Sequence, residues 1–331
     1  MNLVLKGLST SAVIAAMAVS GNAMADSKPT ATLYGKAHLS LASVSADDGT
    51  DDGSATQIKS NSSRLGVKGS YDVEDGLKVT YKVEWQVNMA DNAKSSEDHI
   101  KGRNQYVGLA GGFGEVRVGR HDTAYKLATG KFDLYGDTYI DYNNIIDKSE
   151  DKREDNTIFY TMKADALTLA ASYTLDSTTE DTAAEDSEGD ILSLGLTYKA
   201  GALLLAGGYQ STDEGHSAMK FGAAYSLNEF TFGGVFEQVD TDDDNADESN
   251  ILLMGKYKIS DSNCIKLLFG QKDIDEVDDD PTMIGLGFDH KFNKNATFYA
   301  LVGNGSDGGM DDAGGLEGDS TAISLGMIVK F

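Results

Sequence analysis

Hydrophobic residues recur at every second position in the last eleven residues of the chain, 321–331. Ile323, Leu325, Met327, Val329 and the terminal Phe331 share one face of a predicted strand, and Ala322, Ser324, Gly326, Ile328 and Lys330 share the other. Because successive side chains of a strand point to opposite faces, one face can meet lipid while the other meets water. The pattern predicts a membrane-barrel strand that ends on an aromatic residue at the membrane boundary.

The same alternation is found along several earlier segments. Residues 77–87 place Leu77, Val79, Tyr81, Val83, Trp85 and Val87 on one face and only polar side chains on the other. In 33–41 and 64–71 the period of two puts Lys36, His38 and Arg64 on the polar, inward face. Aromatic residues near strand ends are expected to form girdles at the membrane surfaces, namely Tyr71, Trp85, Tyr106, Tyr160, Tyr173, Tyr198, Tyr209, Tyr225 and Tyr257.

The links between these segments alternate between short and long. Seven short links, rich in turn residues, are predicted at 72–76, 111–114, 163–166, 199–201, 227–229, 260–263 and 293–295. Eight long, acid-rich links are predicted at 45–60, 88–101, 122–155, 176–190, 211–216, 240–249, 273–281 and 304–319. They imply an all-β fold, a transmembrane antiparallel β-barrel of sixteen strands, with short periplasmic turns and long outer loops.

The N-terminus predicts export. Lys6, an apolar run and the small residues Ala23-Met-Ala25 make residues 1–25 a predicted signal peptide, removed on export. The apolar run is too short for a membrane helix, so a mature chain that spans a membrane must do so as a barrel. Residues 26–331 repeat without a Pro-rich linker, which favours one barrel domain over a series of β-sandwiches.

Composition excludes several classes of function. The chain carries 53 acidic and 28 basic residues, a formal net charge of −25, and shows no basic stripe that could bind nucleic acid. Cys264 is the single cysteine, and the five histidines have no metal-ligand spacing, so no disulfide, metal or other cofactor is expected. No Ser/His or Asp/His constellation suggests an enzyme.

Sixteen strands enclose more space than their side chains can fill, so the interior should be an aqueous channel. Its narrowest part is expected from the longest link, 122–155, folded inward. This link carries many apolar residues that an exposed loop would have little reason to keep: Tyr125, Leu127, Phe132, Leu134, Tyr135, Tyr139, Ile140, Tyr142, Ile145 and Ile146.

Several local motifs resemble those of a known family in the same order along the chain. They are Leu33-Tyr-Gly-Lys-Ala37, Ser63-Arg-Leu-Gly-Val-Lys-Gly69, Arg103-Asn-Gln-Tyr-Val-Gly-Leu109, Gly114-Glu-Val-Arg-Val-Gly-Arg120 and Gly326-Met-Ile-Val-Lys-Phe331. Together they resemble the general diffusion porins of Gram-negative outer membranes, the trimeric matrix-porin type, over 26–331.

The resemblance implies a constriction in which the third loop presents carboxylates toward a basic wall. The matching basic positions are Lys36, Arg64 and Arg103, with Arg153 just before a strand at 156–160; the acids are Asp133, Asp137 and Asp141. The loop departs from the family's Pro-Glu-Phe-Gly-Gly-Asp form, so the choice of acids stays open. In an alternative arrangement, Arg153 is an exposed loop charge and Arg117 or Arg120 takes its place on the wall. Opposed charges would create a transverse field that favours polar solutes.

These observations lead to an expected function. The resemblance implies a homotrimeric outer-membrane pore for small hydrophilic solutes and ions, and the surplus of acids at its mouth predicts weak cation selectivity. Outer-membrane lipid and lipopolysaccharide are the expected surroundings. A substrate-specific channel for a sugar or an anion is the first alternative; it would require a ladder of aromatic or basic residues, and the alternation shows none. A surface adhesin or receptor barrel is the second.

Overall fold

The computed structural model describes residues 29–47, 52–74, 76–90, 99–146, 153–176, 189–213, 215–241, 247–275, 279–310 and 318–331. The predicted signal peptide, residues 1–25, and the tips of several long links lie outside these ranges. No helix among the described residues is long and apolar enough to cross a membrane.

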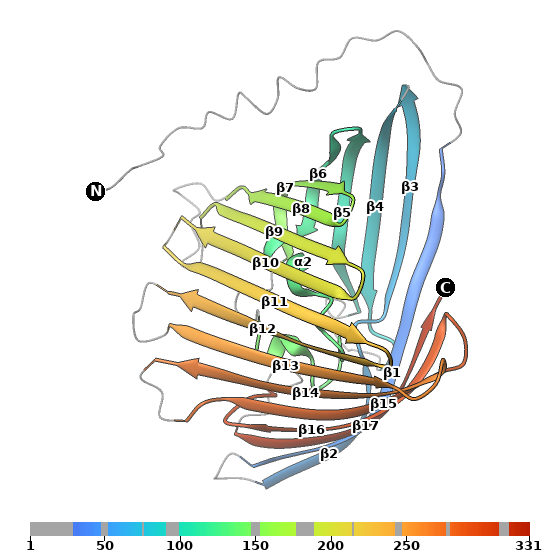
Figure 1. The fold of residues 1–331 in the computed structure, drawn as a ribbon. Helices are drawn as coiled ribbons and strands as arrows, with labels where there is room; N and C mark the ends of the chain where they lie inside the picture. Colours follow the sequence, from blue (N-terminus) through green and yellow to red (C-terminus); the bar gives the residue numbers. More distant parts are fainter. Residues whose placement is uncertain are drawn as a thin grey trace.

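The described chain is a ring of antiparallel strands (Figure 1). The strands are β1 (Thr32–Asp47), β2 (Asp52–Ser60), β3 (Arg64–Glu74), β4 (Leu77–Val87), β5 (Ile100–Gly111), β6 (Gly114–Asp122), β7 (Arg153–Ala164), β8 (Leu167–Thr174), β9 (Ile191–Ala200), β10 (Leu203–Thr212), β11 (Ser217–Leu227), β12 (Phe230–Asp240), β13 (Glu248–Lys258), β14 (Asn263–Ile274), β15 (Thr282–Lys291), β16 (Ala296–Ser306) and β17 (Asp319–Lys330). From β3 onward each strand pairs with the next along the chain. β1 closes the ring because it pairs with β17 on one side and with β2 and β3 on the other.

β2 and β3 are two arms of one barrel strand, so the closed barrel has sixteen strands, as predicted. β1 pairs with β2 along 39–47 and with β3 along 32–36, and the two arms are separated only by residues 61–63. The predicted long link at 45–60 was therefore wrong, because strand occupies most of it. The sequence of β2, Asp-Gly-Ser-Ala-Thr-Gln-Ile-Lys-Ser, lacks the apolar alternation that marks the other strands.

All seven predicted short links are confirmed as tight connections between consecutive strands. They gather at one end of the barrel, toward the top and the right in Figure 1, whereas the long connections lie at the other end. In outer-membrane barrels the short-turn end faces the periplasm.

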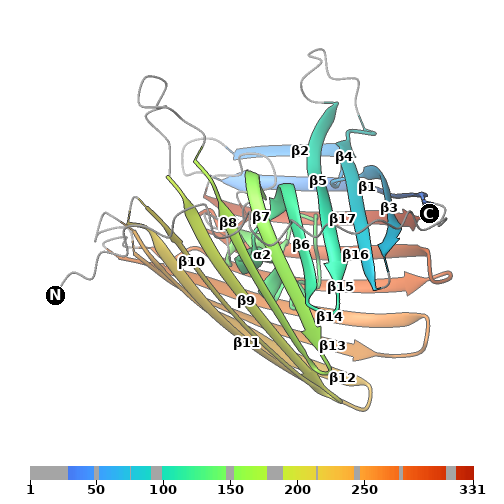
Figure 2. The ribbon, with the colours of Figure 1, turned by 90° about the horizontal axis from the view of Figure 1, so that it is seen from above.

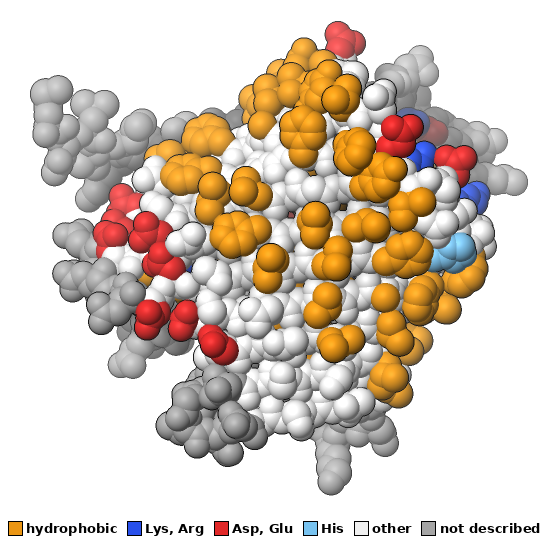
Figure 3. All heavy atoms as spheres, turned by 60° about the horizontal axis from the view of Figure 1, so that its bottom comes forward, with side chains coloured by type: hydrophobic (Ala, Val, Ile, Leu, Met, Phe, Trp, Pro, Cys, Tyr) orange, Lys and Arg blue, Asp and Glu red, His pale blue; other side chains and the backbone are white. Residues whose placement is uncertain are grey.

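The outer face of the barrel is largely apolar. Exposed residues of β17 alternate as predicted, from Ile323 at 56% exposure to Val329 at 37%, while Ala322 and Ser324 are buried. Figure 3 shows hydrophobic side chains spread over the outer surface and most of the visible acidic side chains at its left edge, the end with the long connections. Most of the predicted girdle residues are exposed on this face, but Tyr106 is not: it lies inside, against His121 and Arg117.

The described part of the chain between β6 and β7 lies inside the ring of strands (Figures 1 and 2). We call this part, residues 123–146, the inner loop. It contains the short helix α2 (Ala124–Thr129) and the 3-10 turn η2 (Tyr142–Asn144). Phe132, Ile140, Ile145 and Ile146 are fully buried against the wall, which stabilises each by about 1.5–3 kcal/mol. The inward fold predicted for the link 122–155 is confirmed for residues 123–146, and residues 147–152 lie outside the described ranges.

Glycines in the wall make room for the inner loop. A Cβ atom added at six of them would lie 3.0 Å or less from a loop side chain: Gly208 against Tyr125, Gly222 against Phe132, Gly270 against Ile145, Gly287 against Tyr135, and Gly285 and Gly303 against Ile140. These glycines lie on strands from β10 to β16, so the loop is seated along one half of the barrel wall.

Candidate pore constriction

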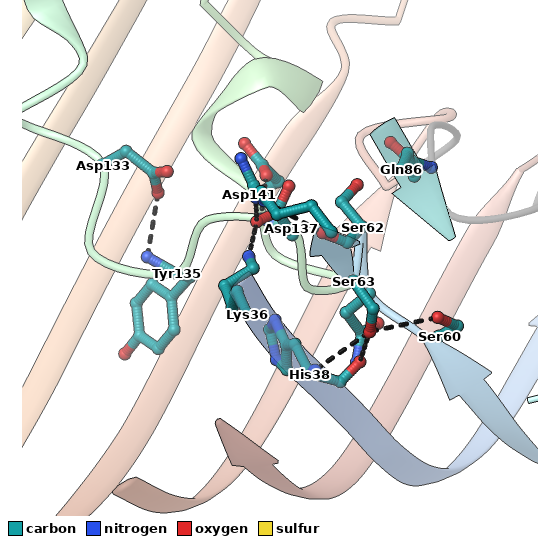
Figure 4. Close-up of polar contacts among 12 residues, drawn as sticks. Lys36, His38, Ser60, Ser62, Ser63, Gln86, Asp133, Tyr135, Asp137 and Asp141 are labelled. Carbon is teal, nitrogen blue, oxygen red and sulfur yellow. Dashed lines mark hydrogen bonds and ion pairs between the residues drawn. The ribbon is translucent and has the colours of Figure 1, made fainter. Parts of the chain in front are cut away.

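Asp137 of the inner loop contacts two basic side chains of the opposite wall, and Figure 4 shows one of these contacts, to Lys36. Its carboxylate pairs with the Lys36 ammonium on β1 and, at 2.8 Å, with the Arg64 guanidinium on β3. We call these three residues the clamp. The structure thus brings together two of the predicted basic residues and one predicted acid, in direct contact rather than across a gap.

The interruption at residues 61–63 positions Arg64 beside Lys36. Lys36 and Arg64 are Cα partners where β1 passes from β2 to β3. At the interruption the Ser63 hydroxyl accepts from the His38 N–H at 2.9 Å and donates to the His38 carbonyl at 3.1 Å, replacing ladder hydrogen bonds. The Ser62 carbonyl accepts from Arg64 Nε. Short polar side chains that bond to the backbone favour such breaks in regular structure.

Hydrogen bonds within the inner loop fix the position of Asp137. Its backbone has φ of +67°, a conformation that Asp tolerates better than most residues. Its N–H donates to Asp141, which also accepts from Asn143 N–H and caps η2. Asp133 accepts from Tyr135 N–H at 2.9 Å. Of the three predicted acids, Asp137 pairs with the wall, and Asp133 and Asp141 accept backbone N–H groups within the loop.

The acids of the inner loop titrate differently. Burial raises the pKa of Asp137, but the charges of Lys36 and Arg64 outweigh it and hold that pKa below its ordinary value. Burial and then the nearby Asp133 charge raise the pKa of Asp141 well above its ordinary value. Asp137 therefore keeps its charge in acid longer than Asp141 does.

The other two predicted basic residues pair with wall acids. Arg103 donates to Glu84 Oε1 at 3.0 Å and to Gln86. Arg153 pairs with Asp122 at 2.7 Å. Arg153 is the first residue of β7 rather than a residue before it, and its side chain is only 14% exposed, so it is not an exposed loop charge.

The two arginines offered as alternatives to Arg153 lie elsewhere. Arg117 lies inside the barrel but pairs with Glu115, two residues away on β6, at 2.7 Å. Arg120 pairs with Asp155, whose side chain is 70% exposed, and lies on the outer surface together with Val118. Arg153 therefore remains the fourth basic candidate.

Several charged residues near the clamp were missed by the sequence interpretation. Glu84 accepts hydrogen bonds from Arg103 and Tyr34 and forms an ion pair with Lys82. Asp122 accepts a hydrogen bond from Asn104 and forms an ion pair with Arg153. The alternation along 77–87 already placed Glu84 on the inward face, so the sequence could have predicted it as a lumen residue. Lys59 could not, because it lies on the unpredicted arm β2, with its ammonium 4.3 Å from the Tyr139 ring centre.

Two cavities meet at the clamp. One, of about 500 Å³, is lined by five basic residues (Lys59, Arg64, Arg103, Lys126, Arg153) and by the three loop acids Asp133, Asp137 and Asp141. The other, of about 480 Å³, extends from the inner loop to the short turn at 292–295 and is lined by four lysines and one aspartate. Gly136 and Thr138, the neighbours of Asp137, line both cavities. The charges of both linings are therefore predominantly positive.

Helix α2 is tethered to the wall far from the clamp. The N–H groups of Ala124 and Tyr125 donate to the hydroxyls of Ser172 and Ser193, which satisfies donors that a helix start otherwise leaves free. The Tyr125 hydroxyl donates to the fully buried Glu237 at 2.7 Å. These contacts hold the start of the inner loop against β8, β9 and β12.

We expect Tyr125→Phe to loosen the inner loop. Loss of a hydrogen bond to a buried carboxylate should cost roughly 1–3 kcal/mol, so trypsin should cleave the inner loop faster and the barrel should unfold at lower temperature. Tyr160→Phe is the matched control, because that hydroxyl donates to Phe113 at an exposed site on the outer face. Equal protease resistance of the two variants would contradict the tether.

Comparisons with known proteins agree with this geometry. The family described as Gram-negative porin matches residues 11–309. Outer membrane protein U of Vibrio vulnificus is 32% identical over 246 residues, which cover 69% of this chain and 68% of that protein. The solved anion-selective porin from Comamonas acidovorans superposes with a TM-score of 0.78 at 21% identity, covering 92% of this chain and 100% of that one. OmpT of Vibrio cholerae in its trimer form gives 0.65 at 19%, covering 92% and 99%.

Proposed function

This chain belongs to the Gram-negative porin family and is an outer-membrane β-barrel protein, and from that premise we propose that it is a passive, water-filled pore for small hydrophilic solutes and ions. The observation that carries the proposal is the clamp. A loop folded into the lumen meets the basic wall between two cavities, so Lys36, Arg64 and Asp137, with Arg103, Arg153, Asp133 and Asp141 around them, would form the constriction.

The lining of the constriction bears on ion selectivity. The acids of the outer loops favour cations, as the sequence predicts, but exposed charges are screened beyond about 10 Å at 0.1 M salt. Charges on a narrow, low-dielectric wall act on every passing ion. Because the cavity at the clamp has more basic than acidic lining residues, we infer that the pore prefers anions, which reverses the sign expected from the sequence.

Reversal potentials test this selectivity. In a planar bilayer with a potassium chloride gradient near 1 M, we expect the sign of anion preference. At low salt the preference should shrink, because the outer acids are then less screened. Cation preference at high salt would contradict the inference and restore the sequence-based expectation. Absence of any current would contradict the pore itself.

The lumen also favours a second candidate, a channel with some specificity for anions. The interior does carry a series of basic residues: Lys59, Arg64 and Arg103 line the cavity at the clamp, and Lys266, Lys291 and Lys330 line the other cavity. The sequence interpretation missed it because these residues come from six different strands. Current that saturates with an anionic solute would distinguish this channel from a general pore.

We further propose a homotrimer set in outer-membrane lipid and lipopolysaccharide. The family membership and the trimer form of OmpT support the assembly. Current that closes in three equal steps per inserted particle would support three pores per particle, and single-step closure would contradict it. Removal of residues 1–25 on export also remains part of the proposal.

A further inference from the structure

We propose that the cavity on the short-turn side of the clamp binds small organic anions that carry an apolar body, such as aromatic monocarboxylates. We call it the lysine cavity. The cavity is formed by β14–β17, the turn at 292–295 and residues 134–138 of the inner loop. Entry of a ligand from the outer side rests on the proposed pore function.

The lysine cavity concentrates positive charge without compensation. Lys266, Lys291, Lys294 and Lys330 line it, and Asp289 is the one carboxylate among its lining residues. Asp289 is already paired with Lys266 at 2.9 Å. Within the described part of the chain, Lys291, Lys294 and Lys330 have no ion pair. Gathering like charges in one concave site is unfavourable, and a bound anion would relieve it.

The roof of the lysine cavity is held in place. Lys266 is 91% buried; its ammonium donates to the Leu134 carbonyl at 2.7 Å and lies 4.4 Å from the Tyr135 ring centre. The Tyr135 hydroxyl donates in turn to the Lys266 carbonyl at 2.6 Å. Gly287 leaves the space that the Tyr135 ring fills. A ligand would thus meet a preformed surface rather than a mobile one.

One side of the lysine cavity is apolar, and this selects the class of anion. Leu134, Leu301 and Ile328 line it together with the lysines. The Thr138 hydroxyl in its lining is buried and has no hydrogen-bond partner among the described residues. A volume of about 480 Å³ suits a small organic molecule. Chloride or phosphate would bind the lysines but would make no contact with the apolar side. A neutral aromatic alcohol would contact the apolar side but would gain nothing from the lysines.

The position of the lysine cavity connects it to the pathway through the clamp. Lys330 is the Cα partner of Lys36, and Gly136 and Thr138 border both cavities. An anion released from Lys36 would therefore meet Lys330 next. The site would lower the free energy of an aromatic carboxylate just after the narrowest point, which makes its passage saturable.

Benzoate is the probe for the test. Added on the short-turn side of single trimers in a bilayer, benzoate should reduce the potassium chloride current saturably, acetate should do so about tenfold more weakly, and benzyl alcohol should have no effect. Saturation-transfer NMR in detergent should show benzoate binding independently of current. Equal block by acetate and benzoate would overturn the apolar part of the proposal.

The matched variants decide whether the lysine cavity is responsible. Lys291→Gln, Lys294→Gln and Lys330→Gln combined should weaken both block and NMR binding about tenfold. The control is Lys163→Gln, Lys199→Gln and Lys258→Gln, which removes as many charges from the same end of the barrel but outside the cavity; it should leave benzoate block nearly unchanged. Equal effects of the two triple variants would overturn the site.

The two proposals can fail separately. A protein that conducts chloride but neither binds nor is blocked by benzoate would disprove the lysine cavity as a site and leave the pore intact. A protein that binds benzoate in detergent but conducts nothing would disprove the pore and leave the site intact.

Discussion

Replacing Gly303 with valine should dislodge the inner loop and raise the single-channel conductance. A Cβ at this position would lie 2.1 Å from Ile140 Cγ2, and Ile140 is fully buried between Gly303 and Gly285. The wall cannot yield without breaking its strand ladder, so the loop must move, at a cost of roughly 1–3 kcal/mol. Because Ile140 lies three residues from Asp137, we expect the clamp to open and the conductance to rise by about a factor of two.

Conductance in planar bilayers and swelling of liposomes in sugars of increasing size would measure this effect. Gly255→Val is the matched control, because a Cβ there meets nothing closer than 3.9 Å. The double variant Gly303→Val with Ile140→Ala should restore the original conductance, because it returns the lost space. A folded Gly303→Val barrel with unchanged conductance and unchanged size limit would show that the inner loop does not set the constriction.

Replacing Asp137 with asparagine should shift the selectivity further toward anions. Lys36 and Arg64 would lose the carboxylate that both contact, so the lining would gain one net positive charge. One charge acting through water over roughly 7 Å contributes about 0.6 kcal/mol, which favours anions and disfavours cations, so the anion-to-cation permeability ratio should rise by a factor of about seven. Reversal potentials under a salt gradient would measure the ratio.

The pH dependence provides an internal check on this variant. The pKa of Asp137 lies below its ordinary value because Lys36 and Arg64 stabilise the charged form. The carboxylate is therefore still charged where an ordinary one is half protonated, and wild type and Asp137→Asn should reach the same selectivity only below about pH 4. Asp155→Asn is the control, since Asp155 lies on the outer face. Convergence near neutral pH, or an equal shift in the control, would contradict the clamp.

The sequence predicted the barrel because the alternation that marks each strand is a local property of that strand. A period of two with one apolar face is visible in β4 and β17 without any knowledge of their neighbours. Turn residues mark the seven short links equally well. The prediction failed at β2, whose polar side chains give no alternation, because that arm is held by pairing with β1 rather than by an apolar face.

The constriction could be predicted only in part. Inward parity identified Lys36 and Arg64, and the family resemblance identified Asp137. That Arg103 bonds to Glu84 and Arg153 to Asp122 could not be predicted, because these partners lie on neighbouring strands in registers shifted by bulges. The wall glycines that make room for the inner loop could not be predicted for a similar reason: nothing near Gly303 in the sequence indicates that Ile140 will pack against it.

By itself, the sequence determined an apolar exterior, a polar interior, sixteen strands and a long apolar link inside the barrel. Each of these follows from side-chain chemistry repeated at short range along one strand or one loop. Only the tertiary structure decided which charges meet. Closure of the ring sets the register that brings Lys36 next to Arg64 and Lys330. The wall glycines set the position of the inner loop, and thereby the position at which Asp137 contacts Lys36 and Arg64. Ion pairing depends on distances of a few ångströms between distant parts of the chain, and those distances exist only once the barrel has closed.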